Sequence, residues 1–419
     1  MFTQTNVRDI MNLGDFMNKI IFHIDVNNAF LSWTACEMIK NGEEDIRNIP
    51  SIIAGDKQKR SGIVLAKSEI AKKCGVKTAQ TINEAQMKCK NLKIFKPDFK
   101  IYKYYSDSMY NILCEYSDSI ERYSIDECFL DYTYVQLLYG NPLKTAKEIQ
   151  DRMYNELGFT VNIGIGNNKL LAKMASELEK PNKINTIYSN EVKTKMWKLP
   201  VQELFMIGRR TVPELNKLNI YTIEDLAKFD KDILKNKFGK FGIQMFNFAN
   251  GIDESDIAKD YIDYKGIGNS MTTNVDIKNR EIAYKYLLSI SECVGKRLRN
   301  EKMYTQCINV NIKDNNFQVT SHQRKLINKI SNTNEIYKIS KELFDEIWKG
   351  QSIRSFGIRL DKLSREEDNQ ISFFTQEKKT KNKKLDEIID KTRNKFGNNT
   401  IKRAVFLNDN IEPILNNKN

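Results

Sequence analysis

The sequence contains only two histidines, His23 and His322, and its seven cysteines show no C-x-x-C pairing. These counts argue against a zinc or histidine–iron centre, so a catalytic metal would need oxygen ligands, which suit hard cations such as Mg²⁺. Several cysteines lie in apolar runs, which indicates buried free thiols in a reducing compartment. No run is apolar enough to cross a bilayer, and the first sixteen residues lack the apolar core of a signal peptide. We therefore expect a cytoplasmic protein that does not enter the membrane.

The charge balance points to a polyanionic partner. Lysine and arginine number 67 against 54 acidic residues, which gives a net charge of +13. A surplus of this size favours nucleic acid, although charge alone does not identify a ligand. The 419 residues exceed the size of one hydrophobic core, so we expect two to four domains.

Two short segments place carboxylates at the ends of apolar, strand-like runs. The run 20–30 carries Asp25, and the run 123–131 carries the adjacent pair Asp126 and Glu127. Buried acidic groups are costly unless something cationic lies between them. Two strands that each end in carboxylates therefore suggest one shared divalent-metal site, of the kind that holds the reacting oxygens of a phosphoryl transfer. Taken alone, Asp126 and Glu127 could instead form a solvated hairpin turn.

The order of predicted elements defines the architecture. A βαββαβ unit with a small basic insertion is predicted within the first 178 residues. Its elements are strand 19–25, helix 28–40, helix 102–116, hairpin strands 120–124 and 128–132, helix 141–157, strand 160–165 and helix 168–178. That order predicts a ferredoxin-like sheet with helices on one face. Residues 199–251 read as helices broken by glycine turns that can offer backbone N–H groups to phosphate. Residues 266–362 read as a second α+β unit with strands 307–313, 316–320 and 355–360, followed by a charged loop at 363–383 and a helix at 385–396.

Several motifs carry a specific family resemblance. They are I-D-V-N-N-A-F at 24–30, Y-S-I-D-E at 123–127, G-I-G-N-N-K-L-L-A-K-M-A-S at 164–176 followed by K-P-N at 180–182, and S-F-G-I-R-L at 355–360. The chain resembles the Y-family (translesion) DNA polymerases, on the bacterial DNA polymerase IV or UmuC-like side. The resemblance implies an α+β right-hand polymerase with a helix-hairpin-helix thumb. It divides the chain into an N-terminal tail at 1–18, a palm at 19–49 and 101–180, fingers at 50–100, a thumb at 181–251, a tether at 252–265, a little finger at 266–362, and a clamp-binding peptide with a C-terminal tail at 363–419. Met17 could be the true initiator in place of Met1.

The resemblance assigns roles around the metal site. Asp25 and Asp126 would bridge two Mg²⁺ ions, Glu127 would complete the ion that activates the primer 3′-hydroxyl, and the Val26 carbonyl would help to bind the other ion. Phe30 would be the steric gate that excludes a ribose 2′-hydroxyl, with an ordinary core aromatic as the alternative.

Two lysines would bind the incoming nucleotide. Lys169, behind Gly164 and Gly166, would contact the triphosphate. In the fingers the family often presents a tyrosine and an arginine, but the aligned places hold Glu69 and Lys72. Lys72 can act as a point charge, and we expect Glu69 to turn away or to pair with a lysine such as Lys72.

The remaining assignments concern DNA and a partner protein. Phosphate contacts would come from the thumb turn and the little finger, although any single residue could be a solvated surface charge; the candidates are Gly208, Arg209, Arg297, Arg354 and Arg359. A short peptide resembles those that dock on the sliding clamp, unless its phenylalanines pack on their own domain; it comprises Gln370, Ile371, Phe373 and Phe374.

The function implied is low-fidelity synthesis across damaged template by a monomer that uses primer–template DNA, dNTP and Mg²⁺, without a proofreading exonuclease. The alternatives are a non-catalytic DNA-binding repair module, in which the carboxylates would be dispensable, and a palm-type nucleotide cyclase, which would need neither thumb nor primer.

Overall fold

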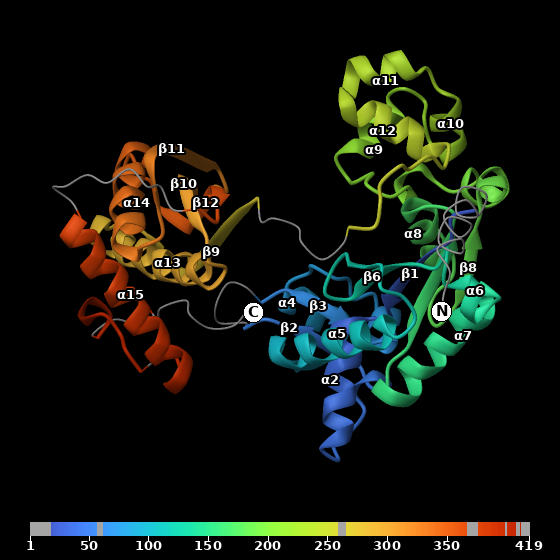
Figure 1. Cartoon of the computed structure of the whole chain (residues 1–419), viewed down its shortest axis with the longest axis horizontal. Helices are drawn as coiled ribbons and strands as arrows, with labels where there is room; N and C mark the ends of the chain where they lie inside the picture. The colour runs from blue at the N-terminus through green and yellow to red at the C-terminus, as the bar shows by residue number, and fades with distance from the viewer. Residues whose placement is uncertain are drawn as a thin grey trace, which may run out of the picture. The chain divides into compact units, whose positions relative to one another are not determined.

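The structure is a computed structural model that describes residues 18–56, 62–258, 265–366, 376–398, 400–407 and 411. The chain divides into two compact units, one comprising residues 1–54 and 64–262 and the other residues 55–63 and 263–419 (Figure 1). The predicted N-terminal tail as far as Met17 lies outside the described residues, as do the predicted clamp-binding residues Gln370, Ile371, Phe373 and Phe374.

A five-stranded sheet forms the centre of the first unit. Its order is β5-β6-β1-β7-β8, and the strands are β1 (Ile21–Val26), β5 (Ile120–Arg122), β6 (Glu127–Asp131), β7 (Val161–Gly166) and β8 (Ile184–Ile187). The first four strands have the predicted ferredoxin-like arrangement, with β1 antiparallel to both β6 and β7. β8 pairs parallel to β7, so the palm sheet extends into residues that the sequence analysis assigned to the thumb.

Helices cover both faces of this sheet, so the expectation of helices on one face is wrong. α2 (Ala29–Lys40), α5 (Phe99–Cys114) and α7 (Pro142–Arg152) pack on the face that carries Phe22 and Ile24. α8 (Lys169–Leu178) packs on the opposite face against Ile21. The glycines of β7 explain this close contact, because a Cβ at Gly164 would lie 2.0 Å from the Ala172 carbonyl oxygen. The G-I-G sequence therefore lets a helix backbone lie directly on the strand.

The insertion predicted as the fingers has a small sheet and an apolar cluster of its own within the first unit. Its sheet has the order β3-β2-β4, and it contains β2 (Ser51–Ala54), β3 (Val64–Lys67), β4 (Lys93–Phe95), α3 (Glu69–Lys73) and α4 (Ile82–Lys88). Ser68 caps α3 by accepting from the Ala71 amide at 3.1 Å. Gly75 follows the helix with φ +85°, a left-handed conformation that glycine commonly adopts at a helix end.

The region predicted as the thumb packs on α8. It consists of α9 (Thr211–Asn216), α10 (Ile223–Lys228), α11 (Lys231–Phe238) and α12 (Lys240–Ala249). Leu170, Leu171 and Met174 of α8 belong to the same apolar cluster as the thumb helices. α8 thus packs on the palm sheet and on the predicted thumb helices, so a substitution in α8 would disturb the packing of both. Shorter elements connect the main ones: α6 (Gln136–Tyr139), the π-helical turns η3 (Met153–Leu157) and η5 (Val192–Met196), and the 3₁₀ turns η1 (Ile46–Asn48), η4 (Ser189–Glu191) and η6 (Val201–Glu203).

The second unit is an antiparallel sheet covered by two helices. The strand order is β11-β10-β12-β9, with β9 (Gly266–Ile277), β10 (Tyr304–Asp314), β11 (Val319–Ile330) and β12 (Ile353–Ser364). α13 (Arg280–Asn300) and α14 (Thr333–Ile347) pack on it through one apolar cluster. The predicted strand at 316–320 is displaced, because the real edge strand β11 is polar and runs to Ile330. Its polar residues gave no period-2 apolar signal.

The C-terminal region also belongs to this unit. α15 (Gln376–Phe396) begins nine residues before the predicted helix, so the loop prediction is wrong for 376–383, and the 3₁₀ turn η7 (Ala404–Phe406) follows. Glu292 of α13 is buried and pairs with Arg393 at 3.3 Å and with Arg403 at 2.6 Å. Arg299 of α13 likewise pairs with Asp386 and Asp390 of α15. Ionic contacts therefore attach α15 to α13, and Figure 1 shows α15 as part of the second unit.

In the part of the chain that the structure describes, no helix has the length and apolar character required to span a membrane. Four of the seven cysteines are buried and carry free thiols, as expected, whereas Cys74 and Cys114 are exposed.

Candidate active site

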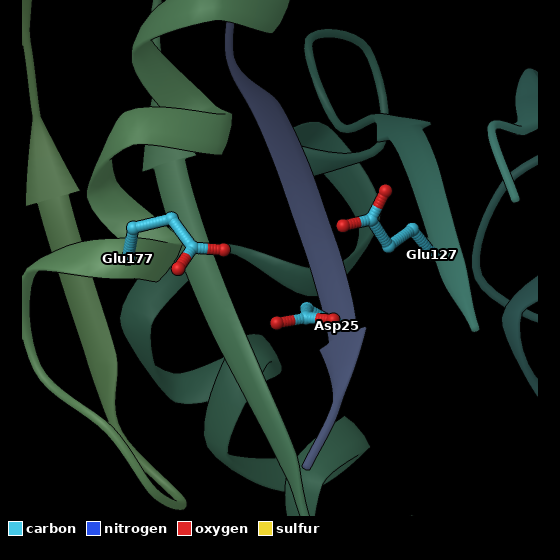
Figure 2. A group of neighbouring side chains, drawn as sticks. All are labelled: Asp25, Glu127 and Glu177. Atoms are coloured by element: carbon cyan, nitrogen blue, oxygen red, sulfur yellow. The ribbon is translucent and has the colours of Figure 1, made fainter. Parts of the chain in front are cut away.

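Three carboxylates from separate elements converge at one end of the palm sheet. Asp25 is the penultimate residue of β1, Glu127 is the first residue of β6, and the two face each other in the antiparallel register. Glu177 comes from the last turn of α8. One carboxylate oxygen of each residue lies within 4.8 Å of the others, and Figure 2 shows the three groups pointing toward one another. Oxygens at this spacing can share a divalent cation.

Asp126 lies beside this group, but its carboxylate has another partner. The carbonyl oxygen of Asp126 accepts a hydrogen bond from the Val26 amide at 3.1 Å, so the backbones of these two predicted site residues are adjacent. Its Oδ1 atom accepts from the Ser124 hydroxyl at 2.6 Å. Of the three predicted ligands, the structure brings Asp25 and Glu127 together, and it adds Glu177, which the sequence analysis did not select. It also places Glu127 in the strand and not in the predicted turn.

Two lysines of the region after β7 neutralise these carboxylates. Lys173 of α8 donates to Glu127 at 2.7 Å, and these side chains are only 11% and 18% exposed. Lys180 donates to Asp25, and also to Glu177 at 2.9 Å. Neither lysine was among the predicted site residues, although both lie in the A-K-M-A-S and K-P-N motifs.

Burial dominates the electrostatics of Asp25. Desolvation raises the pKa of its carboxyl group to about 6, and the nearby Lys180 ammonium only partly offsets this effect. Burial by itself would lower the pKa of Lys180, but the carboxylates of Asp25 and Glu177 together outweigh burial and leave the pKa of this lysine raised. The proton affinity of this pair therefore depends on whether another cation replaces Lys180.

His23 lies under the site and is uncharged. It precedes Asp25 by two residues on the same face of β1, and its Nδ1 atom is 2.8 Å from the Ser176 hydroxyl of α8. Burial, followed by the charges of Lys173 and Lys180, lowers the pKa of His23 well below its ordinary value. A neutral imidazole thus connects the centre of β1 to the turn that carries Glu177.

Phe30 lies in the first turn of α2, a few residues after the carboxylate of β1. Its ring stacks on Tyr102 of α5, with centroids 4.6 Å apart and planes inclined by 20°. The Tyr102 hydroxyl lies 3.2 Å from that of Thr34. Phe30 is half-buried, so its ring is supported from behind and only part of it remains accessible.

The fingers reach the site through the loop after β1. The Asn28 side-chain amide donates to the Lys67 carbonyl at 2.6 Å, and Asn28 adopts a left-handed conformation with φ 51°. Lys72 of α3 pairs with Glu69 at 3.4 Å, and both side chains are exposed. The predicted pairing of Glu69 is therefore present.

Lys169 lies elsewhere, and this placement argues against its predicted contact with triphosphate. The register of β1 and β7 pairs Asp25 with Asn162 but Ile21 with Gly166, so the start of α8 is at the opposite end of the strand from Asp25. The Lys169 ammonium instead contacts both carboxylate oxygens of Glu121, at 2.9 and 2.7 Å. The glycines before it serve helix packing, as described above.

The predicted DNA contacts are spread over both units. Gly208 and Arg209 are exposed in the turn before α9. In the second unit, Arg297 donates to the Gly268 carbonyl at 3.0 Å and Arg359 pairs with Asp361 at 2.7 Å. The Arg354 guanidinium lies over the Phe317 ring, 5.0 Å from its centroid.

Comparison with known proteins agrees with this fold. Residues 24–177 match the impB/mucB/samB family, and residues 264–373 match the C-terminal domain of that family. The DNA polymerase IV of Clostridium acetobutylicum is 47% identical over 93% of this chain and 99% of its own length. That of Acetivibrio thermocellus is 36% identical over 94% and 98%. The fold of a Y-family DNA polymerase chimera, Dbh-Dpo4(243-245)-Dbh, matches with a TM-score of 0.72 at 24% identity, over 82% of this chain and 98% of that one.

A ferredoxin-like palm with converging carboxylates, together with a separate antiparallel-sheet domain, defines a Y-family polymerase. The chain belongs to this family, the impB/mucB/samB family, and its curated relatives place it with the DNA polymerase IV branch. It is accordingly a DNA-directed DNA polymerase of translesion synthesis. The C-terminal family domain also decides against a nucleotide cyclase.

Proposed function

We propose that this polymerase extends a primer by nucleotidyl transfer at two Mg²⁺ ions held by Asp25, Asp126 and Glu127, with help from the Val26 carbonyl. The observation that carries the proposal is the direct pairing of Asp25 and Glu127 across β1 and β6. The donor set consists of oxygens, as Mg²⁺ prefers. The hydroxyl of Ser124 is a weak partner that a dication would readily displace from Asp126.

Bound Mg²⁺ would favour the ionised primer 3′-hydroxyl and offset charge on the triphosphate. The protein would supply the positions of these groups. Lys173 and Lys180 balance the carboxylates without metal. Once a dication takes over that task, the partly exposed Lys180 ammonium is available to the triphosphate. Lys72 of the fingers would add a second positive charge, provided that it leaves Glu69.

Phe30 would select the sugar. Its ring is supported by Tyr102 and cannot retreat into the core without breaking that stack. A ribose 2′-hydroxyl above the ring would therefore clash with a side chain that cannot move away.

Duplex DNA would be bound through phosphate contacts in both units, by a monomer in the cytoplasm. Gly208 and Arg209 in the thumb turn and Arg297, Arg354 and Arg359 in the little finger are the candidates. Arg297 and Arg359 are already engaged within the protein, so their contribution requires an exchange of partners. Fidelity would be low, because among the described residues the palm, fingers, thumb and little finger leave no separate domain for a proofreading exonuclease.

The peptide Gln370–Phe374 would dock on a sliding clamp, and this part of the proposal rests on sequence alone. Paired substitution of Phe373 and Phe374 by alanine should weaken clamp-stimulated synthesis but leave distributive synthesis intact. An equal response of both proteins to the clamp would assign these phenylalanines a structural role.

Primer extension tests the catalytic proposal. Asp25→Ala, Asp126→Ala and Glu127→Ala should each reduce the single-turnover rate by more than a hundredfold with Mg²⁺, while the affinity for primer–template stays within about twofold. A template with an abasic site should be copied past the lesion by the unaltered protein. If Asp126→Ala is fully active and Glu177→Ala is inactive, then Glu177 and not Asp126 is the third metal ligand.

A further inference from the structure

The chain segment that leaves the thumb is attached to the palm by specific contacts. Asp253 accepts from the Leu170 amide at the start of α8 at 3.1 Å. Five residues later, the Ala258 amide donates to the Glu121 carboxylate at 2.7 Å. Between them, Ile257 is only 8% exposed and packs with Ile21, Phe129 and Ala172. The first half of the predicted tether is therefore an ordered part of the palm surface.

A buried ion pair is the centre of this attachment. The Lys169 ammonium contacts both oxygens of Glu121, and these side chains are only 14% and 10% exposed. The same ammonium lies 3.4 Å from the Asp256 carbonyl oxygen and over the ring of Phe129, 5.1 Å from its centroid. Lys169 thus neutralises a carboxylate that accepts one linker amide, and it also reaches the linker itself. Charge-assisted hydrogen bonds of this kind are stronger than neutral ones.

We infer that Glu121 and Lys169 are positioning residues that anchor the linker and limit how far the second unit can move from the catalytic carboxylates. The attachment at Ala258 leaves seven residues before β9 begins at Gly266. Seven residues span at most about 25 Å. Without the anchor, the preceding fixed point is Asp253, and the twelve residues after it span about 40 Å.

The consequence for synthesis follows from effective concentration. When the first unit already holds a duplex, a shorter link keeps the second unit closer to that duplex and raises its effective concentration there. For a link that nearly doubles in length, the effective concentration falls by about two- to threefold. Release of the anchor should therefore weaken DNA binding by about that factor, without altering the carboxylate site at the other end of β7.

Two variants remove the anchor in different ways. Ile257→Ser changes only the linker side. The double variant Glu121→Gln with Lys169→Met removes both charges together, so neither is left buried without a partner. Lys19→Met is the matched control, because Lys19 pairs with Asp256 at an exposed position outside the buried contact.

Limited trypsin digestion and DNA binding of the full chain provide the readouts. Cleavage within 253–265 should accelerate by about tenfold or more in both anchor variants and should not change in Lys19→Met. The Kd for primer–template should rise by about two- to threefold, while the KM for dNTP of Ile257→Ser stays at the wild-type value. Unchanged cleavage in both anchor variants would overturn the inference. A raised KM for dNTP in the double variant, with DNA affinity unchanged, would overturn it as well and return Lys169 to nucleotide binding.

Discussion

Replacement of Asp25 by asparagine should make the metal-free protein more stable, although it removes a proposed metal ligand. Burial raises the pKa of the Asp25 carboxyl group from 3.8 to about 6. Because the folded-state pKa lies above the unfolded one, protonated Asp25 stabilises the fold at low pH, and this contribution is lost as the pH rises through 6. Ionisation of the buried carboxyl group therefore lowers the free energy of unfolding by about 3 kcal/mol at pH 8 and by less than about 1 kcal/mol at pH 4. An amide cannot ionise, so Asp25→Asn should gain these amounts.

Urea unfolding in the presence of EDTA at several pH values measures the effect, and hydrogen exchange of the β1 peptide localises it. Glu177→Gln is the matched control, because it removes an exposed carboxylate from the same cluster and should change stability by less than about 0.5 kcal/mol. Addition of Mg²⁺ should stabilise the unaltered protein and not Asp25→Asn. An equal gain at pH 4 and pH 8, or no gain at pH 8, would refute the reasoning, because the cost would then not arise from an ionised buried carboxylate.

Three other changes test separate parts of the structure. Phe30→Ala should raise ribonucleotide incorporation at least tenfold in single-nucleotide extension assays while dNTP incorporation continues; unchanged sugar selectivity would exclude the gate. Gly164→Ala should lower the free energy of unfolding by more than about 3 kcal/mol, because the new Cβ would lie 2.0 Å from the Ala172 carbonyl oxygen; a wild-type Tm would contradict the close packing of α8. Glu292→Gln should destabilise the second unit by about 3 kcal/mol by leaving Arg393 buried without a charge partner, and calorimetry showing no change would mean that α15 is held by other contacts.

Much of the palm could be predicted because its sequence signals are local. Phe22 and Ile24 alternate with residues of the other face of β1, and this period places Asp25 at the end of a buried strand. The order of strands and helices then fixed the ferredoxin-like pairing, since few topologies fit it. Asp25 and Glu127 could be expected to converge for the same reason.

The rest depended on contacts between elements that no local pattern encodes. Lys173 and Glu177 are four residues apart on α8, a spacing typical of a solvated helix face, yet Lys173 is buried against Glu127. Gly164 resembled part of a phosphate-binding turn, whereas its role is to admit the α8 backbone. The polar and largely exposed residues of β11 gave no apolar period, and neither did the charged sequence of α15, which is attached by ion pairs such as those of Arg299 with Asp386 and Asp390.

The charge distribution of the site suggests why metal and nucleotide should bind together. Four carboxylates lie at or beside the end of β1, and Lys173 and Lys180 offset only two of these charges. Two divalent cations would change this remaining net charge from negative to positive and would repel both lysines at close range. A triphosphate brings enough negative charge to compensate, and it offers Lys180 a new partner in place of Asp25. The site would therefore keep a similar net charge with its own lysines alone or with metals and nucleotide together, whereas metals alone would leave it positive and should bind incompletely.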